Sequence, residues 1–96
     1  MKIQQNKYPL AYCVGQRIRI LRKKYGMTAN ELAEQLNVSQ QQFSRYERGV
    51  NRIDIDSLAL LSYFFNVSIH YFFEGIDFTE MQFIHSDISF SYLNTD

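Results

Sequence analysis

Two helix-start signals stand close together near the middle of the chain. The stretch "TANE" places Thr28 three residues before Glu31, and "SQQQ" places Ser39 three residues before Gln42. In such a capping box the hydroxyl accepts the backbone N–H three residues on, and the longer side chain reaches back to the first residue's N–H. Asn37 lies between the two signals, and Asn tolerates the left-handed backbone conformation of a sharp turn. The sequence therefore predicts two short helices joined by a tight turn.

The second helix of this pair is expected to have two different sides. Phe43 and Tyr46 face inward, and Gly49 ends the helix. In the first helix of the pair, the buried face consists of Leu32, Ala33 and Leu36. The outward side of the second helix carries a continuous polar stripe, made of Gln40, Gln41, Ser44, Arg45 and Arg48.

A further helix is predicted before this pair. Apolar residues at Val14, Ile18, Leu21 and Tyr25 have helical spacing, and Gly26 is expected to end the helix. The basic side chains near them lie away from this apolar stripe. The helix therefore buries one face and exposes positive charge on the other.

The helix after the pair is capped by Asp54 or Asp56. Its stretch "LALLSYFF" is apolar on nearly all sides, which a helix buried on one side would not need. One face (Leu58, Leu61 and Phe65) serves the core, and the other needs a second surface to cover Leu60, Tyr63 and Phe64.

The chain ends in a short helix and a tail. Ser68 is expected to cap the stretch "IHYFFEG", which Gly75 closes. In the tail, Ile88, Phe90 and Tyr92 alternate with serines, a pattern that fits a strand and a loosely ordered segment equally well.

Charge is segregated along the chain, although the formal net charge is zero. Residues 1–52 contain all ten basic residues and three of the ten acidic ones, a net charge of +7, and residues 53–96 carry −7. A solvated charged surface is the simplest explanation for most proteins, but complete segregation favours a polyanionic partner for the first half.

Several functional classes are excluded or disfavoured. With 96 residues and 46% hydrophobic residues, the chain is expected to form one globular domain, without a membrane span or signal peptide. A single cysteine, Cys13, allows no internal disulfide and favours a cytoplasmic protein in which Cys13 packs rather than reacts. His70 and His85 have no further ligand at metal spacing. We expect no cofactor, no small-molecule ligand and no enzymatic activity, because no nucleophile–base pair, phosphate loop or metal cluster is evident.

The arrangement resembles the Cro/CI-type (XRE) helix-turn-helix regulators of bacteria and phages. The resemblance is carried by "VGQRIRILRKKYGMTANELAEQLNVSQQQFSRYERG" and by "LALLSYFFNVSIHYFF". Within that family "SQQQFSRYERG" is most similar to small regulators encoded with bacterial fimbrial operons. The resemblance implies an all-α, five-helix domain over residues 14–75. It would be flanked by an N-terminal arm over residues 1–13 and by a C-terminal extension over residues 76–96. The extension would be either a strand or a loop.

In such a domain the recognition helix reads double-stranded DNA. Gln can pair with adenine and Arg with guanine in the major groove, and residues at the helix start and one turn later reach base edges. This assigns Gln40, Gln41 and Arg45 to bases, with Ser44 as a lesser candidate. The resemblance places the phosphate contacts at Arg48, Asn51 and Arg52, and backbone donors near Thr28 and Ala29 join them because a helix start attracts phosphate.

Other residues are assigned structural roles by the same resemblance. Arg22 and Glu47 match a pair that bridges the first and third helices, a role preferred here over DNA contact for Arg22. Lys23 and Lys24 face either phosphate or solvent.

A homodimer is expected, because uncovered apolar side chains would form an unusual exposed patch. Its interface would contain Leu60, Tyr63, Phe64, Tyr71, Phe78, Phe83 and Phe90.

Two functions remain from the sequence. The first is a homodimeric, sequence-specific transcription regulator acting on an operator with two half-sites, such as a repressor of fimbrial and motility genes. The second is an antitoxin-like or scaffold module whose aromatic C-terminal part binds another protein. The fold serves both. The basic recognition stripe favours the first function, and the aromatic tail is what the second would use.

Overall fold

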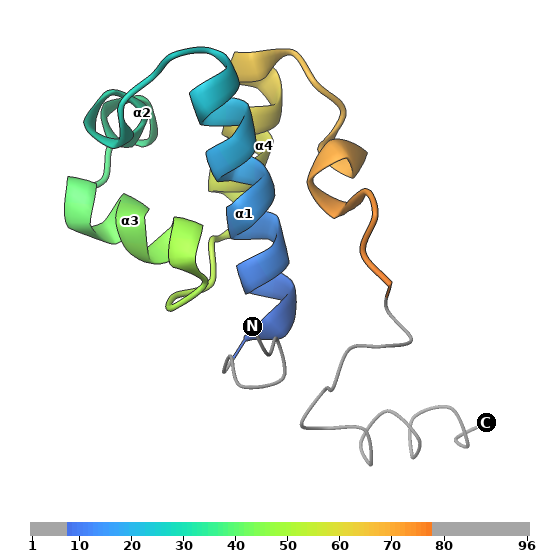
Figure 1. Cartoon of the computed structure of the whole chain (residues 1–96). Coiled ribbons are helices and arrows are strands. Elements are labelled where there is room, and N and C mark those ends of the chain that lie inside the picture. Colours follow the sequence, from blue (N-terminus) through green and yellow to red (C-terminus); the bar gives the residue numbers. More distant parts are fainter. Residues whose placement is uncertain (1–7, 78–96) are drawn as a thin grey trace.

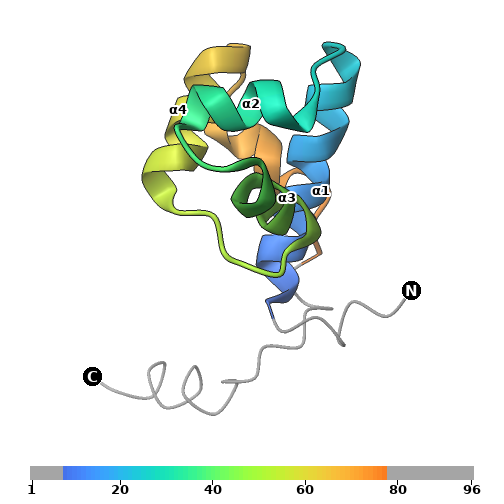
Figure 2. The same ribbon diagram turned by 90° about the vertical axis from the view of Figure 1, so that its left-hand side faces the viewer.

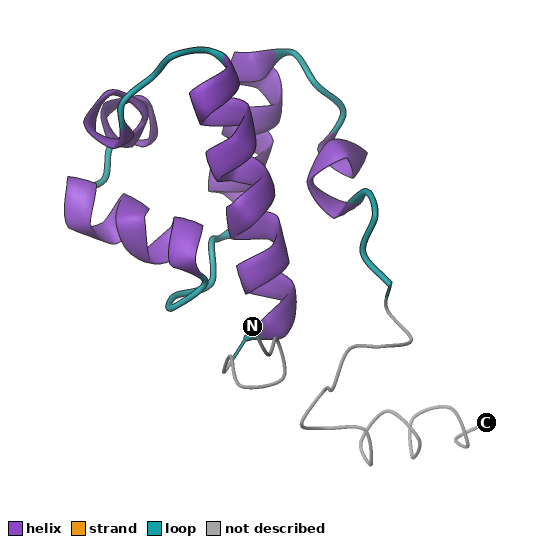
Figure 3. Cartoon of the chain, viewed as in Figure 1, coloured by secondary structure: helices purple, strands orange, loops and turns teal. Residues whose placement is uncertain are grey.

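The computed structural model describes residues 8–77, and all regular structure within that range is helical (Figure 3). The α-helices are α1 (Pro9–Lys24), α2 (Ala29–Leu36), α3 (Gln40–Arg48) and α4 (Ile55–Phe65), followed by a 3₁₀ helix, η2 (Ile69–Phe73). In Figure 1, α1 runs through the middle of the molecule, with α2 and α3 on one side and η2 on the other. α1 packs against α3 and η2, and α2 packs against α3 and α4.

α1 begins earlier than the apolar spacing predicted. Its first residue is Pro9 rather than Val14. Proline suits the first helical position, because its fixed φ is already helical and the N–H that it lacks would have no partner there. The helix ends at Lys24, and Gly26 follows with a left-handed φ of 68°, as predicted.

The paired helices have the predicted caps and turn. The N–H of Glu31 donates to Thr28 Oγ1 at 3.1 Å, and the N–H of Thr28 donates to Glu31 Oε1 at 2.9 Å, which completes the capping box of α2. Asn37 has a left-handed φ of 57° in the turn. The Ser39 hydroxyl caps α3, and Gly49 ends that helix with a φ of 72°.

Of the two candidate caps for α4, Asp54 is the one used. Its Oδ2 accepts the backbone N–H of Ser57 at 2.9 Å, and its Oδ1 accepts the Ser57 hydroxyl at 2.8 Å. Asp56 lies within the first turn, where a negative charge also suits the helix N-terminus.

The predicted fifth α-helix is instead the five-residue 3₁₀ helix η2. Its start is capped by Ser68, and the N–H of Tyr71 donates to the Ser68 carbonyl in a three-residue bond. A five-residue segment has room for very few of the i→i+4 hydrogen bonds of an α-helix, and short helical pieces often form i→i+3 bonds instead. In this 3₁₀ helix Phe72 is fully buried. The alternatives of a strand or a loop for the C-terminal extension fall mostly on residues 78–96, which lie outside the described range.

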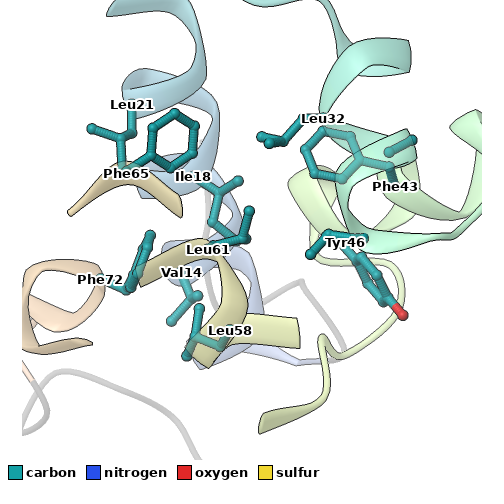
Figure 4. Close-up of a cluster of buried hydrophobic side chains, with 12 residues drawn as sticks. Val14, Ile18, Leu21, Leu32, Phe43, Tyr46, Leu58, Leu61, Phe65 and Phe72 are labelled. Carbon is teal, nitrogen blue, oxygen red and sulfur yellow. The ribbon is translucent and has the colours of Figure 1, made fainter. Parts of the chain in front are cut away.

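The core draws side chains from every helix (Figure 4). Phe43 and Phe72 are the largest fully buried side chains, and they come from α3 and η2. Other buried hydrophobic residues are Val14, Ile18, Leu21, Leu32, Ala33, Leu36, Tyr46, Leu58, Leu61 and Phe65. Because α3 buries Phe43 and Tyr46 in this core, its opposite side is held outward in a fixed orientation.

Candidate nucleic-acid interface

The outer side of α3 is a row of polar side chains. Gln40, Gln41, Arg45 and Arg48 are exposed, and Ser44 is half-buried. Figure 2 looks onto the side of the molecule where α2 and α3 lie, in front of α1 and α4. A helix that presents amides and guanidinium groups in one row has the donors and acceptors that base edges in the major groove can pair with.

Ser44 and Arg48 contact each other within this row. Arg48 Nε donates to Ser44 Oγ at 3.3 Å, one helical turn apart. The Ser44 oxygen therefore already accepts one hydrogen bond from its own helix, and its O–H remains a donor. The contact leaves the outer N–H groups of Arg48 available to a phosphate.

The start of α3 differs from the predicted capping box in one respect. The Gln42 N–H donates to Ser39 Oγ at 3.0 Å, as a cap requires. The Gln42 side chain, however, accepts a hydrogen bond from Asn51 Nδ2 at 3.3 Å instead of reaching back to Ser39. The second capping box was thus only half right, because the loop after α3 folds back and offers Gln42 a donor.

The start of α2 offers fewer backbone donors than predicted. The N–H of Thr28 is already donated to the Glu31 carboxylate. The N–H groups of Ala29 and the residue after it are the first of the helix and have no partner four residues before them. A phosphate at this helix start would therefore meet Ala29, beside a negative charge on Glu31.

Arg22 and Glu47 form a buried ion pair between α1 and α3. Arg22 Nε lies 2.7 Å from Glu47 Oε2, and Arg22 Nη2 donates to Glu47 Oε1 at 3.1 Å. Arg22 Nη1 also donates to the carbonyl of Met27 at 2.8 Å. Arg19, which is more exposed, lies 3.8 Å from the same carboxylate. One arginine thus joins α1, the turn before α2, and the buried side of α3.

α1 and α3 also approach each other through their backbones. A Cβ placed on Gly15 would lie 2.3 Å from the carbonyl oxygen of Tyr46 and 2.6 Å from that of Glu47. Gln16 Nε2 donates to the Glu47 carbonyl at 3.1 Å. Gly15 was not among the predicted structural residues, although a glycine inside a helical pattern costs stability and so indicates a packing reason.

The loop after α3 is held close to its neighbours. The N–H groups of Val50 and Asn51 both donate to the carbonyl of Arg45, at 3.0 and 3.3 Å. The Arg52 guanidinium lies over the Tyr8 ring, 4.7 Å from its centre. Asn51 and Arg52, both assigned to phosphate, therefore lie on one loop that is attached to α3 and to the start of α1. Tyr8 was not among the predicted site residues, and nothing in the local pattern pointed to it.

The residues assigned to a dimer interface divide into three groups. Leu60, Tyr63 and Phe64 lie on α4 with exposed fractions of 51, 86 and 42%. Tyr71 is half-buried on η2, where the Arg17 guanidinium lies 4.2 Å from its ring centre. Phe78, Phe83 and Phe90 lie outside the described residues. The exposed apolar face of α4, made of Leu60, Tyr63 and Phe64, is thus what the structure describes of this set.

Within residues 8–77, titratable and metal-binding groups outside the polar row give no second site. Burial raises the pKa of the Cys13 thiol, which disfavours a reactive thiolate. Across residues 8–77, no three His, Cys, Asp or Glu side chains gather closely enough to hold a metal ion. No helix in that range has the length and apolar character needed to cross a membrane.

Comparison with known proteins places this geometry in a family. Residues 18–72 match the protein family described as helix-turn-helix. An uncharacterised HTH-type transcriptional regulator of Rickettsia prowazekii is 39% identical over 64 residues, which cover 67% of this chain and 49% of that protein. The HTH-type transcriptional regulator ImmR of Bacillus subtilis is 41% identical over 58 residues, covering 60% of this chain and 46% of ImmR. The chain thus spans about half the length of these curated relatives.

A solved structure shows the same fold. The clp gene regulator ClgR of Corynebacterium glutamicum matches with a TM-score of 0.63 and 30% sequence identity, over 67% of this chain and 68% of that one.

Proposed function

The chain belongs to the helix-turn-helix family, and on that premise we propose that it is a transcription regulator that binds specific sites in double-stranded DNA. The observation that carries the proposal is the polar row of α3, exposed along a helix whose other side is fixed in the core. A helix held in this way can enter the major groove without first having to be ordered.

The proposed contacts divide by chemistry. Gln40, Gln41 and Arg45 are exposed and would read base edges, whereas Ser44 is engaged by Arg48 and has a secondary role at most. Arg48, Asn51 and Arg52 would contact phosphates, together with the backbone at the start of α2 near Thr28 and Ala29. Contacts of the first kind give specificity, and those of the second kind give affinity and register.

We propose further that two copies act together. What supports this is the exposed apolar face of α4, which a second copy could cover through a two-fold contact that uses the same surface on both chains. Two half-sites on one operator would then match the two recognition helices. The sequence resemblance further supports the proposal that the regulated genes are fimbrial and motility genes. We place the protein in the cytoplasm.

The same apolar face supports the second candidate function, an antitoxin-like or scaffold module. In that case an unrelated protein, rather than a second copy, would cover Leu60, Tyr63 and Phe64. Purification of the full chain from its own cells distinguishes the two. A stoichiometric complex with a different small protein favours the module, and a dimer of this chain alone favours the regulator.

The regulator proposal is tested by selecting binding sites from random DNA and measuring variants on the selected site. Gln40→Ala, Gln41→Ala and Arg45→Ala should each lose roughly 1–3 kcal/mol on the selected site and much less on random DNA. Gln35→Ala is the matched control, since Gln35 is an exposed glutamine of α2 outside the polar row. If the three variants keep full discrimination between selected and random DNA, α3 is not the reading element.

A further inference from the structure

We infer that Tyr8 and Gln42 are positioning residues, which hold the loop of residues 50–52 in place for a DNA phosphate. The inference rests on the proposed function and names two side chains to which no DNA contact has been assigned. Neither residue needs to touch DNA for this role. Each acts through a loop residue that was assigned to phosphate, Gln42 through Asn51 and Tyr8 through Arg52.

The first attachment is between the loop and α3. Asn51 Nδ2 donates to Gln42 Oε1 at 3.3 Å in a partly buried contact, and the Asn51 N–H donates to the Arg45 carbonyl at 3.3 Å. Asn51 is therefore fixed to α3 through both its side chain and its backbone. Any movement of the polar row of α3 would carry this residue with it.

The second attachment is between the loop and the start of α1. The Arg52 guanidinium lies over the Tyr8 ring at 4.7 Å, and Tyr8 is the residue directly before the buried Pro9 that opens α1. A stacked guanidinium keeps the N–H groups on its edge available for a bidentate contact with phosphate. Arg52 is exposed, so those groups face solvent and could meet a ligand.

The backbone around Gly49 leaves this loop little freedom. A Cβ on Gly49 would lie 2.4 Å from the Cα of Tyr12, which shows how closely the end of α3 approaches α1. The loop is thus attached at both ends of a short segment. A loop ordered before binding loses less conformational freedom when it binds, so its contacts contribute more of their energy to affinity.

The test measures binding of the full chain to a random-sequence DNA duplex, since phosphate contacts act on any sequence. Tyr8→Leu should weaken binding roughly two- to fivefold for each bound copy of the chain, the range expected for an exposed cation–π contact of about 0.5–1 kcal/mol. Tyr8→Phe keeps the ring beneath Arg52 and should bind more tightly than Tyr8→Leu. Tyr25→Leu is the matched control, since Tyr25 is an exposed tyrosine at the other end of α1.

A double-mutant cycle separates positioning from a general loss of stability. In an Arg52→Ala background, Tyr8→Leu should have no further effect, because the residue that it positions is gone. In an Asn51→Ala background, Gln42→Ala should likewise have no further effect. Additive losses in both cycles would overturn the inference.

A measurement without DNA keeps the inference testable if the proposed function fails. In the free protein, NMR should show the side-chain protons of Arg52 shifted upfield by the Tyr8 ring. Tyr8→Leu should abolish that shift and Tyr8→Phe should preserve it. Absence of the shift in the wild type would overturn the Tyr8 attachment, whether or not DNA binds. A wild type that shows the shift but binds no duplex would overturn the proposed function, and the DNA role of both residues with it.

Discussion

The backbone of Gly15 in α1 lies against the carbonyl oxygen of Tyr46 in α3, so closely that a Cβ on Gly15 would approach that oxygen to 2.3 Å. Real side chains do not make contacts this short, so any other residue would push the two helices apart. The same stretch of α3 carries the polar row on its outer side. A small residue in α1 therefore determines where the proposed reading surface stands.

We expect Gly15→Ala to destabilise the fold by roughly 1–3 kcal/mol, because overpacking against backbone atoms outweighs the gain in helix propensity. The shift of α3 should also weaken DNA binding. Gly26→Ala is the contrast: it meets no atom within 4 Å but has a left-handed φ of 68°. It should therefore cost stability without changing DNA discrimination. Urea unfolding and a quantitative shift assay measure the two effects, and a Gly15→Ala protein as stable as wild type would contradict the close packing.

The buried ion pair between Arg22 and Glu47 gives a second prediction. Glu47→Gln leaves the Arg22 charge buried without its anionic partner, so we expect a loss of about 3–5 kcal/mol in the free energy of unfolding. The double variant Arg22→Met, Glu47→Leu should recover much of that loss, because it leaves neither charge unpaired. Chemical denaturation of the single and double variants checks this. Equal stability of Glu47→Gln and wild type would show that the ion pair between Arg22 and Glu47 does not stabilise the fold.

Asp54 should contribute a pH-dependent part of the stability. Hydrogen bonds from the Ser57 side chain, then from the Ser57 backbone N–H, hold the pKa of Asp54 below its usual value. A carboxyl group whose pKa is lowered by folding stabilises the protein above its unfolded pKa of about 3.9. That contribution is lost as the pH falls through the lower folded pKa.

Two variants of Asp54 separate the cap from the charge. Asp54→Ala should cost roughly 0.5–2 kcal/mol at neutral pH, because the cap of α4 is lost. Asp54→Asn keeps a cap, so its stability at neutral pH should be much closer to that of the wild type. As the pH falls below about 5, its stability should decrease less than that of the wild type. Thermal unfolding across that range measures both. An identical acid profile for wild type and Asp54→Asn would mean that another carboxyl group dominates.

Binding should depend strongly on salt if the basic half of the chain meets the DNA backbone. A dimer that makes about 6–10 phosphate contacts should lose on the order of 10³–10⁵ in affinity between 50 and 200 mM salt. Arg48→Gln removes one phosphate contact from each protomer of the dimer, so it should reduce the slope of log affinity against log salt by about 2. Arg17→Gln removes the same charge on the side facing η2, where Arg17 pairs with Glu74 at 3.2 Å, and should leave the slope unchanged. If the DNA affinity of the wild type does not change with salt, residues 1–52 do not contact the DNA phosphates.

The apolar face of α4 gives the last prediction. Tyr63→Glu replaces a side chain that is 86% exposed, so the monomer should still fold. If a second copy covers Tyr63, however, each of the two protomers loses roughly 1.5–3 kcal/mol of apolar burial, so dimerisation weakens on the order of 10²–10⁴-fold. Ile20→Glu makes the same kind of change on α1, at 54% exposure, and is the control. Sedimentation gives the oligomeric state. A wild-type monomer at micromolar concentration that still binds a two-half-site operator tightly would contradict the dimer.

Features that depend on neighbouring residues were determined by the sequence itself. Thr28 with Glu31, Ser39 with the N–H of Gln42, and the left-handed Asn37 all involve groups within three or four residues of one another. The buried hydrophobic faces of α2, α3 and α4 were predicted for the same reason, since they follow from spacing along a single helix. In α1, Val14, Ile18 and Leu21 are buried as predicted, but Tyr25 lies after the end of the helix and is 55% exposed. These local rules were enough to predict the helix-turn-helix and the outward direction of the polar row.

Only the tertiary structure decided how the elements meet. Gln42 could cap its own helix or bond elsewhere, and it turns to Asn51 because the loop after α3 returns to it. Gly15 and Tyr46, or Tyr8 and Arg52, are more than 30 residues apart, so no local pattern relates them. The last helix is a five-residue 3₁₀ helix whose Phe72 is fully buried, and its apolar spacing alone did not distinguish it from an α-helix. Sequence fixes which hydrogen bonds a short segment can make; where two segments touch depends on packing all of the helices around one core.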